Sequence, residues 1–262
     1  MNNFCILGTD SRSICLRKIL IENKVKFAEL EDANIIVTAI PFTKDGVKVN
    51  GEIITCDDLI KLLKDSNKIL ISGAFSKDIE VKLQNNNIKY FDLMQSDSMA
   101  ILNAIPTAEG AISTAIFNTE FTIQNSNILI LGYGRIGKVL AKMLNGFGAN
   151  VFCEARKESD LSMIKAMGYT PIKLENLDEN LEKMNIIFNT IPYMVLDKKR
   201  LDLISENALI VDLASSPGGV DFKYAKDTNK RVEWALALPT KVAPYTAALY
   251  IKEEISKILS TI

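Results

Sequence analysis

The sequence contains no histidine among its 262 residues. This absence excludes a histidine acid or base, a Ser-His-Asp triad and metal sites with histidine ligands. Proton transfer must therefore use Asp, Glu, Lys, Tyr, Cys or water. Cysteine is also scarce, and Cys5, Cys15, Cys56 and Cys153 form no CxxC pair. We therefore expect no metal site, and we expect the thiols to be buried in a reducing compartment.

A charge excess and long apolar runs are also missing. Lys and Arg total 31 against 32 for Asp and Glu, which gives a net charge of -1 and no attraction to nucleic acid or an anionic membrane. No apolar run approaches the roughly 20 residues of a membrane span, and the N-terminus has no basic run before an apolar stretch. These absences predict a cytoplasmic protein whose partners are small molecules or proteins.

Short β-branched runs alternate with amphipathic stretches along the whole chain. This alternation predicts an α/β fold with two doubly wound parallel-sheet lobes, the second of them a Rossmann domain in a 2-hydroxyacid-dehydrogenase-like arrangement. The domains expected are an N-terminal substrate or partner lobe at 1–96, a connecting helix at 97–121, the Rossmann domain at 122–240, and a C-terminal helix at 241–262 that returns toward the first lobe.

The strands expected in the first lobe are 4–7, 35–37, 68–71 and 88–91, with helices near 11–23, 56–65 and 76–86. The strands expected in the second lobe are 127–131, 150–154, 186–191, 208–213 and 231–237. The segment IIVTAIP resembles IIFNTIP, which indicates either an internal repeat or the shared pattern of buried parallel strands. Within the connecting helix, Pro106 marks a helix start or a kink.

A glycine-rich turn follows the strand expected at 127–131. It predicts dinucleotide binding, because its glycines allow a tight turn, close approach to a pyrophosphate and close packing of the next helix on the strand. The free amides at the helix start attract phosphate. A degenerate loop is the alternative. The turn residues predicted to bind the cofactor are Gly132, Tyr133, Gly134, Arg135, Ile136 and Gly137.

The residues after the second strand of this domain distinguish the two nicotinamide cofactors. An acidic residue there favours NAD, and a basic one favours the 2′-phosphate of NADP. The sequence Glu154-Ala155-Arg156-Lys157 contains both. Arg156 and Lys157 predict NADP(H), because a guanidinium binds phosphate bidentately, and Glu154 is expected to point to the opposite side. Alternatively, both basic residues lie in a solvated loop.

Several later loops carry further candidates. Thr190 and Pro192 follow a strand whose loop we expect beside the nicotinamide, whereas Gly218 and Gly219 fit a turn at least as well as a ligand contact. Lys241 and Thr246 are predicted to hold a substrate carboxylate.

The first lobe and the connecting helix add candidates of their own. Arg12 is predicted to bind an anionic substrate, and Asp10 either takes part in catalysis or caps the next helix. In the connecting helix, Asn103, Thr107 and Glu109 are either site residues or ordinary helix-start residues.

Three segments together resemble one family, the A subunits of dipicolinate synthase. They are Ile101-Leu102-Asn103-Ala104-Ile105-Pro106-Thr107-Ala108-Glu109-Gly110-Ala111-Ile112, the glycine turn at 132–137, and Leu238-Pro239-Thr240-Lys241-Val242-Ala243-Pro244. The first and third segments are more specific than the glycine turn, and the resemblance covers essentially the whole chain. A small or neutral residue is expected in this family where Glu154 stands, which leaves the cofactor preference open.

The resemblance implies NADP-linked oxidation of dihydrodipicolinate to dipicolinate in the mother cell of a sporulating bacterium. It also implies an oligomer with a B subunit similar to flavoproteins. Arg12 and Lys241 are the partners expected for the two substrate carboxylates, and Asp10, Glu109 and Lys241 are the candidate proton acceptors. Two alternatives remain: an NADP-binding regulatory or scaffolding subunit, and another small-acid dehydrogenase, although that group generally uses a histidine.

Overall fold

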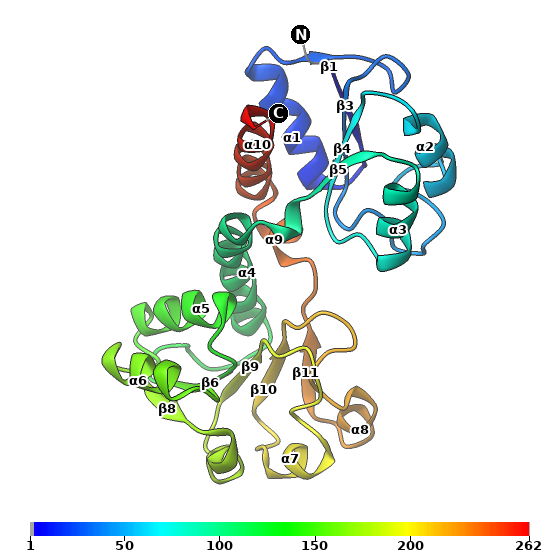
Figure 1. The fold of residues 1–262 in the computed structure, drawn as a ribbon. Helices are drawn as coiled ribbons and strands as arrows, with labels where there is room; N and C mark the ends of the chain where they lie inside the picture. Colours follow the sequence, from blue (N-terminus) through cyan, green and yellow to red (C-terminus); the bar gives the residue numbers. More distant parts are fainter. Residues whose placement is uncertain (1–2, 262) are drawn as a thin grey trace. The chain divides into compact units, whose positions relative to one another are not determined.

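The computed structural model describes residues 3–261. The chain divides into two compact units: unit 1 contains the residues up to Asn103 and those from Pro239 onward, and unit 2 is Ala104–Leu238. Each unit has one sheet, and all pairings between the named strands are parallel. The predicted α/β class with two parallel sheets is therefore confirmed (Figure 1).

Unit 1 has a five-stranded sheet in the order β2-β1-β3-β4-β5, an open, doubly wound arrangement. Its strands are β1 (Asn3–Leu7), β2 (Lys26–Phe27), β3 (Ile35–Thr38), β4 (Ile69–Ser72) and β5 (Lys89–Asp92). Its helices are α1 (Ser11–Glu22), α2 (Cys56–Leu63), α3 (Lys77–Asn85), η1 (Leu93–Gln95), α9, which begins at the unit boundary (Leu238–Val242), and α10 (Pro244–Ser260).

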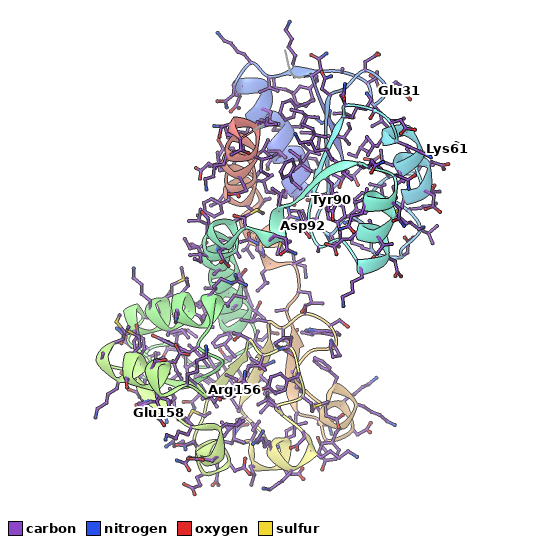
Figure 2. All side chains as sticks on the ribbon, in the orientation of Figure 1. Glu31, Lys61, Tyr90, Asp92, Arg156 and Glu158 are labelled. Carbon is purple, nitrogen blue, oxygen red and sulfur yellow. The ribbon has the colours of Figure 1, made fainter. Side chains whose placement is uncertain are left out.

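Alternate residues of the strands in unit 1 pack against different helices. In β3, Ile35 and Val37 face one cluster, which includes apolar residues of α1 and α10, whereas Ile36 faces a second cluster with α2 and α3. This alternation follows from the period of two in a β-strand. At the sheet's carboxyl edge, Asp92 (labelled in Figure 2) accepts hydrogen bonds from the amides of Ala74 and Met94. Because α10 contributes residues to the cluster that Ile35 and Val37 face, the last helix of the chain completes the core of the first unit.

Unit 2 has a six-stranded sheet in the order β11-β10-β9-β6-β7-β8. Numbered along the chain, this is the 3-2-1-4-5-6 order of the dinucleotide-binding Rossmann fold. Its strands are β6 (Asn127–Leu131), β7 (Asn150–Glu154), β8 (Thr170–Ile172), β9 (Ile186–Asn189), β10 (Leu209–Asp212) and β11 (Arg231–Trp234). Its helices are the greater part of α4 (Asp97–Phe117), and α5 (Arg135–Gly146), α6 (Glu158–Ala166), η2 (Leu174–Asn176), η3 (Asp178–Asn180), α7 (Lys198–Leu203) and α8 (Phe222–Asp227).

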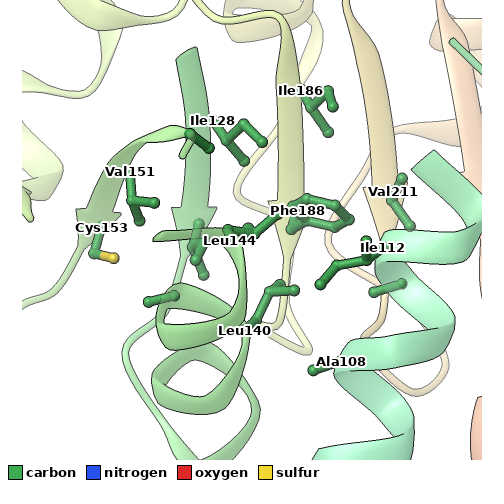
Figure 3. Packing of buried hydrophobic residues seen from close by; sticks show 14 of the residues in the cluster. Ala108, Ile112, Ile128, Leu140, Leu144, Val151, Cys153, Ile186, Phe188 and Val211 are labelled. Atoms are coloured by element: carbon green, nitrogen blue, oxygen red, sulfur yellow. The ribbon is translucent and has the colours of Figure 1, made fainter. Parts of the chain in front are cut away.

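Buried apolar residues cover both faces of this sheet. On one face, Ile128 and Phe188 pack with Leu140 and Leu144 of α5 and with Ile112 of α4 (Figure 3). The other face packs against a second cluster that includes apolar residues of α7 and α8. Strands buried on both faces read as continuous apolar runs, which is why they were recognisable in the sequence.

Helix α4 is 21 residues long and continues through Pro106. The helix begins nine residues before the proline, so the interpretation of Pro106 as a helix start is wrong. By length and hydropathy α4 is also the one helix in the described residues that could cross a membrane, with 39% of its most apolar window buried. The expectation that no segment approaches a membrane span overlooked this helix. Ala108, Ala111 and Ala115 of α4 pack in the core of unit 2, and this packing accounts for its apolar character.

The cysteines are all unpaired thiols. Cys56 and Cys153 are buried, whereas Cys5 and Cys15 are only partly so, and the expectation that all four are buried is wrong for this pair. Burial raises the pKa of the Cys153 thiol to about 12, so this thiol stays protonated at neutral pH.

Candidate functional site

The glycine turn joins β6 to α5, and each glycine in it has its own steric reason. Gly132 has a φ of +92°, and a Cβ on it would lie 2.6 Å from Thr190 Oγ1. A Cβ on Gly137 would lie 2.1 Å from the Gly132 carbonyl oxygen, so α5 could not pack this closely with any other residue. A Cβ on Gly134, by contrast, would meet no atom within 4 Å. The open space at Gly134 fits the approach of a pyrophosphate.

A pocket of about 300 Å³ opens at the carboxyl ends of β6, β7 and β9. Parallel sheets bind their ligands at this edge, where the strand order reverses. The pocket brings together seven of the residues predicted to bind the cofactor. The other predicted turn residues lie outside it: Gly137 lies against Gly132, Ile136 packs on the core and Arg135 begins α5. The pocket is lined by Gly132, Tyr133, Gly134, Glu154, Ala155, Arg156, Lys157, Asp160, Thr190, Ile191, Pro192 and Tyr193.

Glu154 lines this pocket, although the sequence predicted that it would point to the opposite side. The residue ends β7 beside Leu131, and the start of the glycine turn lies within reach of its side chain. Glu154 Oε2 accepts a hydrogen bond from the Gly132 amide at 3.2 Å, and only 2% of the residue is exposed. The alternation of side chains along the strand did not predict this direction of the Glu154 side chain, because β7 ends at Glu154 and a loop follows directly.

The free oxygen of this carboxyl is the most unusual feature of the pocket. Glu154 Oε1 is buried and makes no hydrogen bond to any described residue. Burial raises the pKa of Glu154, while the Gly132 amide and the positive charges of Arg156 and Arg200 act in the opposite direction. A buried acceptor without a partner is uncommon in native proteins, and a polar group of a ligand would satisfy it.

Arg156, which is labelled in Figure 2, and Lys157 lie shortly after Glu154 in the sequence and supply the positive charge of the pocket. The guanidinium carbon of Arg156 lies 5.9 Å from the centre of the Tyr193 ring, within the range of a cation–π contact. Tyr193 therefore helps to hold the guanidinium at the pocket. The geometry suits an anionic group on the adenosine side of a dinucleotide.

Two buried polar residues that are not among the predicted site residues shape the neighbouring loops. Asn189 and Asp212 end β9 and β10, and both are fully buried. Asp212 accepts hydrogen bonds from the Asn189 side chain and from the amides of Ala214 and Gly219, at 2.8 to 2.9 Å. A signal was present in the sequence, since both are polar residues at the end of an apolar strand.

The loop after β9 is fixed by three further hydrogen bonds. The Asn189 side chain bonds the amide and the carbonyl of Ile191, at 3.1 and 3.0 Å. Thr190 Oγ1 donates to the Leu131 carbonyl at 2.9 Å, and this bond ties the loop to the end of β6. Gly219 has a steric role, because a Cβ on it would lie 2.3 Å from Asn189 Nδ2.

In unit 1, Asp10 is the N-cap of α1. Its carboxyl accepts hydrogen bonds from the amides of Arg12 and Ser13 and from the Ser13 hydroxyl, so the capping interpretation accounts for its contacts. Arg12 is 7% exposed, and its Nη2 donates to the Ile40 carbonyl at 2.8 Å. The cavity beside Arg12 has a volume of only about 10 Å³, which is about the space for one water molecule.

Lys241 lies near the start of α1, also within unit 1. Ser11 Oγ donates to the carbonyl of Thr240 at 2.8 Å and so joins two segments that are 229 residues apart in sequence. The side chain of Lys241 is exposed, and Thr246 is half-buried in the first turn of α10. Segment 238–242, which the sequence predicted to open the last helix, forms a separate short helix, α9, before α10.

Asn103, Thr107 and Glu109 lie on α4. Asn103 and Thr107 are half-buried, on either side of the boundary between the units. Glu109 is exposed beside an apolar groove, which is lined by Ile112, Ser113, Ile116, Phe117, Met143 and Phe147. None of the residues of this groove lines the pocket at the glycine turn.

Comparison with known proteins assigns the second unit independently of this geometry. Residues 96–217 match the family described as D-isomer specific 2-hydroxyacid dehydrogenase, NAD binding domain. The structure of D-lactate dehydrogenase from Escherichia coli is 13% identical to this chain, with a TM-score of 0.67. The match covers 99% of this chain and 97% of that chain and shows that the two share a fold.

More similar proteins share one name. The A subunit of dipicolinate synthase from Bacillus subtilis is 39% identical over 192 residues, which are 73% of this chain and 64% of that protein, so the match spans less than two thirds of the relative.

Two crystal structures extend the similarity over nearly the whole chain. The dipicolinate synthase A subunit from Bacillus halodurans has a TM-score of 0.90 at 28% identity, covering 98% of this chain and 97% of that chain. The corresponding protein from Bacillus subtilis has a TM-score of 0.88 at 30% identity, covering 99% and 96%. The chain therefore belongs to the family of dipicolinate synthase A subunits, whose fold is that of NAD(P)-dependent oxidoreductases.

Proposed function

We propose that this chain is the A subunit of a two-subunit synthase and oxidises dihydrodipicolinate to dipicolinate with NADP⁺. The observation that carries the proposal is the pocket of about 300 Å³ at the glycine turn, with Arg156 and Lys157 on its wall. Membership of the family of dipicolinate synthase A subunits supports the choice of substrate. The oxidation is an aromatisation of the substrate ring.

The reaction removes one hydride and one proton from the ring: dihydrodipicolinate and NADP⁺ give dipicolinate, NADPH and a proton. When bound, the nicotinamide accepts the hydride and its two electrons. The chain contributes the turn that receives the pyrophosphate and the loop of Thr190 and Pro192, which we assign to the nicotinamide side of the pocket. The proton must be accepted by Asp, Glu, Lys, Tyr, Cys or water, because the chain has no histidine.

Lys241 is our first choice for a substrate carboxylate, because its side chain is exposed on a short helix that contacts the start of α1. Arg12 is the weaker choice, since its guanidinium is buried and already donates to Ile40. Thr246, Asn103 and Thr107 are the remaining proposed contacts.

Three groups remain our candidates for the proton acceptor. Lys241 is favoured over Asp10, whose carboxyl already caps α1, and over Glu109, which lies at the apolar groove of α4. A lysine can act as the base only in its neutral form.

The preference for NADP(H) rests on Arg156, which is held near Tyr193 at the pocket. A guanidinium can bind a 2′-phosphate through two hydrogen bonds, whereas a ribose hydroxyl offers it much less. Lys157 adds a second positive charge on the same wall. We further propose that the partner is a flavoprotein-like B subunit, that the enzyme is an oligomer, and that it works in the mother cell of a sporulating bacterium.

A second candidate function is an NADP-binding regulatory or scaffolding subunit. It is favoured by the capping role of Asp10 and the burial of Arg12, which leave few groups free for catalysis in unit 1. Formation of NADPH from freshly made dihydrodipicolinate distinguishes the two functions. The assay uses this chain by itself, the B subunit by itself, and both together.

We expect NADPH only where this chain is present. Turnover by the isolated B subunit would reduce this chain to the regulatory function. Failure of the combined subunits would refute the dipicolinate assignment, while binding of NADPH in the same preparation would show that the cofactor pocket itself is intact.

A further inference from the structure

Asp212 is a fully buried carboxyl that joins the loops after two neighbouring strands. Its Oδ1 accepts the side-chain amide of Asn189 at 2.8 Å and the backbone amide of Ala214 at 2.9 Å, and its Oδ2 accepts the backbone amide of Gly219 at 2.8 Å. Three neutral groups thus donate to a residue that is 0% exposed. Burying a carboxyl group costs free energy that an apolar residue at the end of β10 would not, so we expect the carboxyl to have a use at the two loops.

The loop after β9 is hydrogen-bonded to the end of β10 and to the loop that follows it. At its start, the Asn189 side chain bonds the backbone of Ile191 and also donates to Asp212. At its end, the amides of residues 195–196 both donate to the Gly219 carbonyl at 2.9 Å. Because Asp212 accepts the amide of the same glycine, one carboxyl fixes both ends of the loop after β9.

The two loops also pack directly against each other. A Cβ on Gly219 would lie 2.3 Å from Asn189 Nδ2 and 2.7 Å from the Ile191 carbonyl oxygen. A Cβ on Gly218, which has a φ of +83°, would lie 2.8 Å from Asp212 Oδ2. Only glycine permits this approach, so the loops hold each other in place by close packing as well as by hydrogen bonds.

The loop after β9 forms one wall of the pocket at the glycine turn. Residues 190–193 all line that pocket, and Thr190 Oγ1 joins them to the end of β6 at the Leu131 carbonyl. Asp212 is not among the lining residues, so it acts on a bound cofactor through the loop. A shift of this wall would move the cofactor, and misplacing a reacting group by about 1 Å can lower a rate about a hundredfold.

We propose that Asp212 is a positioning residue for the nicotinamide half of the cofactor: through both loops it holds residues 190–192 where hydride transfer requires them. The inference rests on the proposed function in that the loop after β9 receives the nicotinamide. The adenosine half depends on residues 156–157 after β7, and Arg156 contacts this loop at the ring of Tyr193, which is 43% exposed. Loss of the Asp212 bonds therefore weakens the nicotinamide half and spares the adenosine half.

The test compares NADPH with adenosine 2′,5′-bisphosphate, a fragment that has the adenosine and the 2′-phosphate but no nicotinamide. Calorimetric titration of the purified chain gives both dissociation constants and the fraction of chains that bind. The variant is Asp212→Asn, which keeps the size of the side chain but turns one acceptor oxygen into a donor that faces other donors. The matched control is Asp221→Asn, because Asp221 caps α8 through the Tyr224 amide and asparagine caps equally well.

We expect Asp212→Asn to weaken NADPH binding about tenfold and binding of the fragment less than about twofold, so the ratio of the two constants shifts about fivefold or more. In the assembled subunits, kcat per binding-competent chain should fall about tenfold or more. Asp221→Asn should leave both constants within about twofold. Equal changes for NADPH and the fragment, or an unchanged kcat per binding-competent chain, would overturn the inference.

The fraction of chains that bind separates positioning from a purely structural role. If Asp212→Asn only lowered stability, fewer chains would bind, but those that did would keep both dissociation constants and kcat. If that protein does not fold, Asn189→Ala decides the question with the same expected shift in the ratio, because it removes the link to Ile191 while the carboxyl keeps two amide donors.

The proposed function can fail separately from the inference. If the wild-type subunits do not oxidise dihydrodipicolinate but the chain binds NADPH, the proposed reaction is refuted, and the ratio of the two dissociation constants still decides the role of Asp212. If the wild-type chain binds neither NADPH nor the fragment, the proposed function is overturned and the inference falls with it.

Discussion

The Asn189 side chain donates a hydrogen bond of 2.8 Å to the Asp212 carboxyl, and this bond joins the ends of two adjacent strands, β9 and β10. Asp212 also accepts the amides of Ala214 and Gly219, so one buried carboxyl fixes the loop that follows β10. Through Asn189 it also acts on Ile191, which lines the cofactor pocket.

Asp212→Ala should lower the free energy of unfolding by about 3 kcal/mol, because it leaves three buried donors without their acceptor. Urea denaturation followed by the fluorescence of Trp234, the only tryptophan in the sequence, measures this change. Asp221→Ala, which removes only the cap of α8, should cost about 1 kcal/mol. Equal losses in the two variants would contradict the role of Asp212.

The glycine turn offers a pair of substitutions that separates binding from folding. Gly134→Ala places a methyl group in open space, so it should change the free energy of unfolding by less than about 1 kcal/mol. The methyl group occupies the space left for the pyrophosphate, and we expect NADPH affinity to fall at least about tenfold, or about 1.4 kcal/mol. Calorimetric titration and urea denaturation of the same preparation test both statements.

Gly137→Ala is the counterpart, because its methyl group would collide with the Gly132 carbonyl oxygen at 2.1 Å. It should lower both the stability and the affinity, by about 2 kcal/mol or more for stability. A stable Gly137→Ala protein with normal NADPH binding would show that the turn tolerates a wider separation of α5 from β6.

Arg156→Ala should weaken NADPH binding about tenfold or more and leave NADH binding nearly unchanged, because only the 2′-phosphate loses its partner. Titration of both cofactors at low and high salt measures this, and the loss should shrink as salt screens the charge. Lys142→Ala removes an exposed positive charge of α5 outside the pocket lining and serves as the control. Equal effects of Arg156→Ala on both cofactors would refute the preference for NADP(H).

Lys241→Met should raise the KM for dihydrodipicolinate about tenfold, while the dissociation constant of NADPH stays the same, if Lys241 binds a substrate carboxylate. Steady-state kinetics of the assembled subunits and a cofactor titration give the two quantities. Lys18→Met, on the exposed side of α1, is the matched control. An unchanged KM together with a lower kcat would assign Lys241 to proton transfer instead.

The pH dependence of stability tests the burial of Glu154. Burial raises the pKa of this carboxyl in the folded protein, so the folded state binds more protons than the unfolded state. Its contribution to stability is therefore complete below the ordinary glutamate pKa of about 4.3 and is lost as the pH rises through the higher value in the folded protein.

Glu154→Gln should consequently be more stable than the wild type at about pH 8, and the difference should vanish at about pH 4. Thermal unfolding across this range measures the difference between the two proteins, with Glu158→Gln as the control. A constant difference at all pH values would show that Glu154 is not ionised in a buried site.

Much of the fold was predictable because its strands are apolar runs with clear ends. The strands of unit 2 that are buried on both faces of the sheet, such as β9 and β10, have bounds within two residues of those predicted from the sequence. The prediction missed β2 and β8, which have two and three residues and offer no periodicity to detect, and β8 also contains Pro171.

The site was less predictable because it depends on directions that spacing does not give. The glycine turn could be recognised from residue types alone, since its constraints are steric and local. The orientation of Glu154 could not be recognised in this way, because an error of one residue in the position of a strand end reverses the face of the sheet on which a side chain is expected. The buried position of Arg12 depends on the distant Ile40 carbonyl, which no local pattern shows.

The packing of α10 on α1 has a consequence for the order in which the protein is made. A ribosome adds about 5–20 residues per second, so tens of seconds separate the synthesis of Leu20 from that of Ile251, another member of the same core cluster. The Rossmann unit is continuous in sequence and can complete its core during that interval. The face of the first sheet that packs on α1 and α10 stays only partly covered until α10 leaves the ribosome, which makes unit 1 the segment that chaperones are expected to protect.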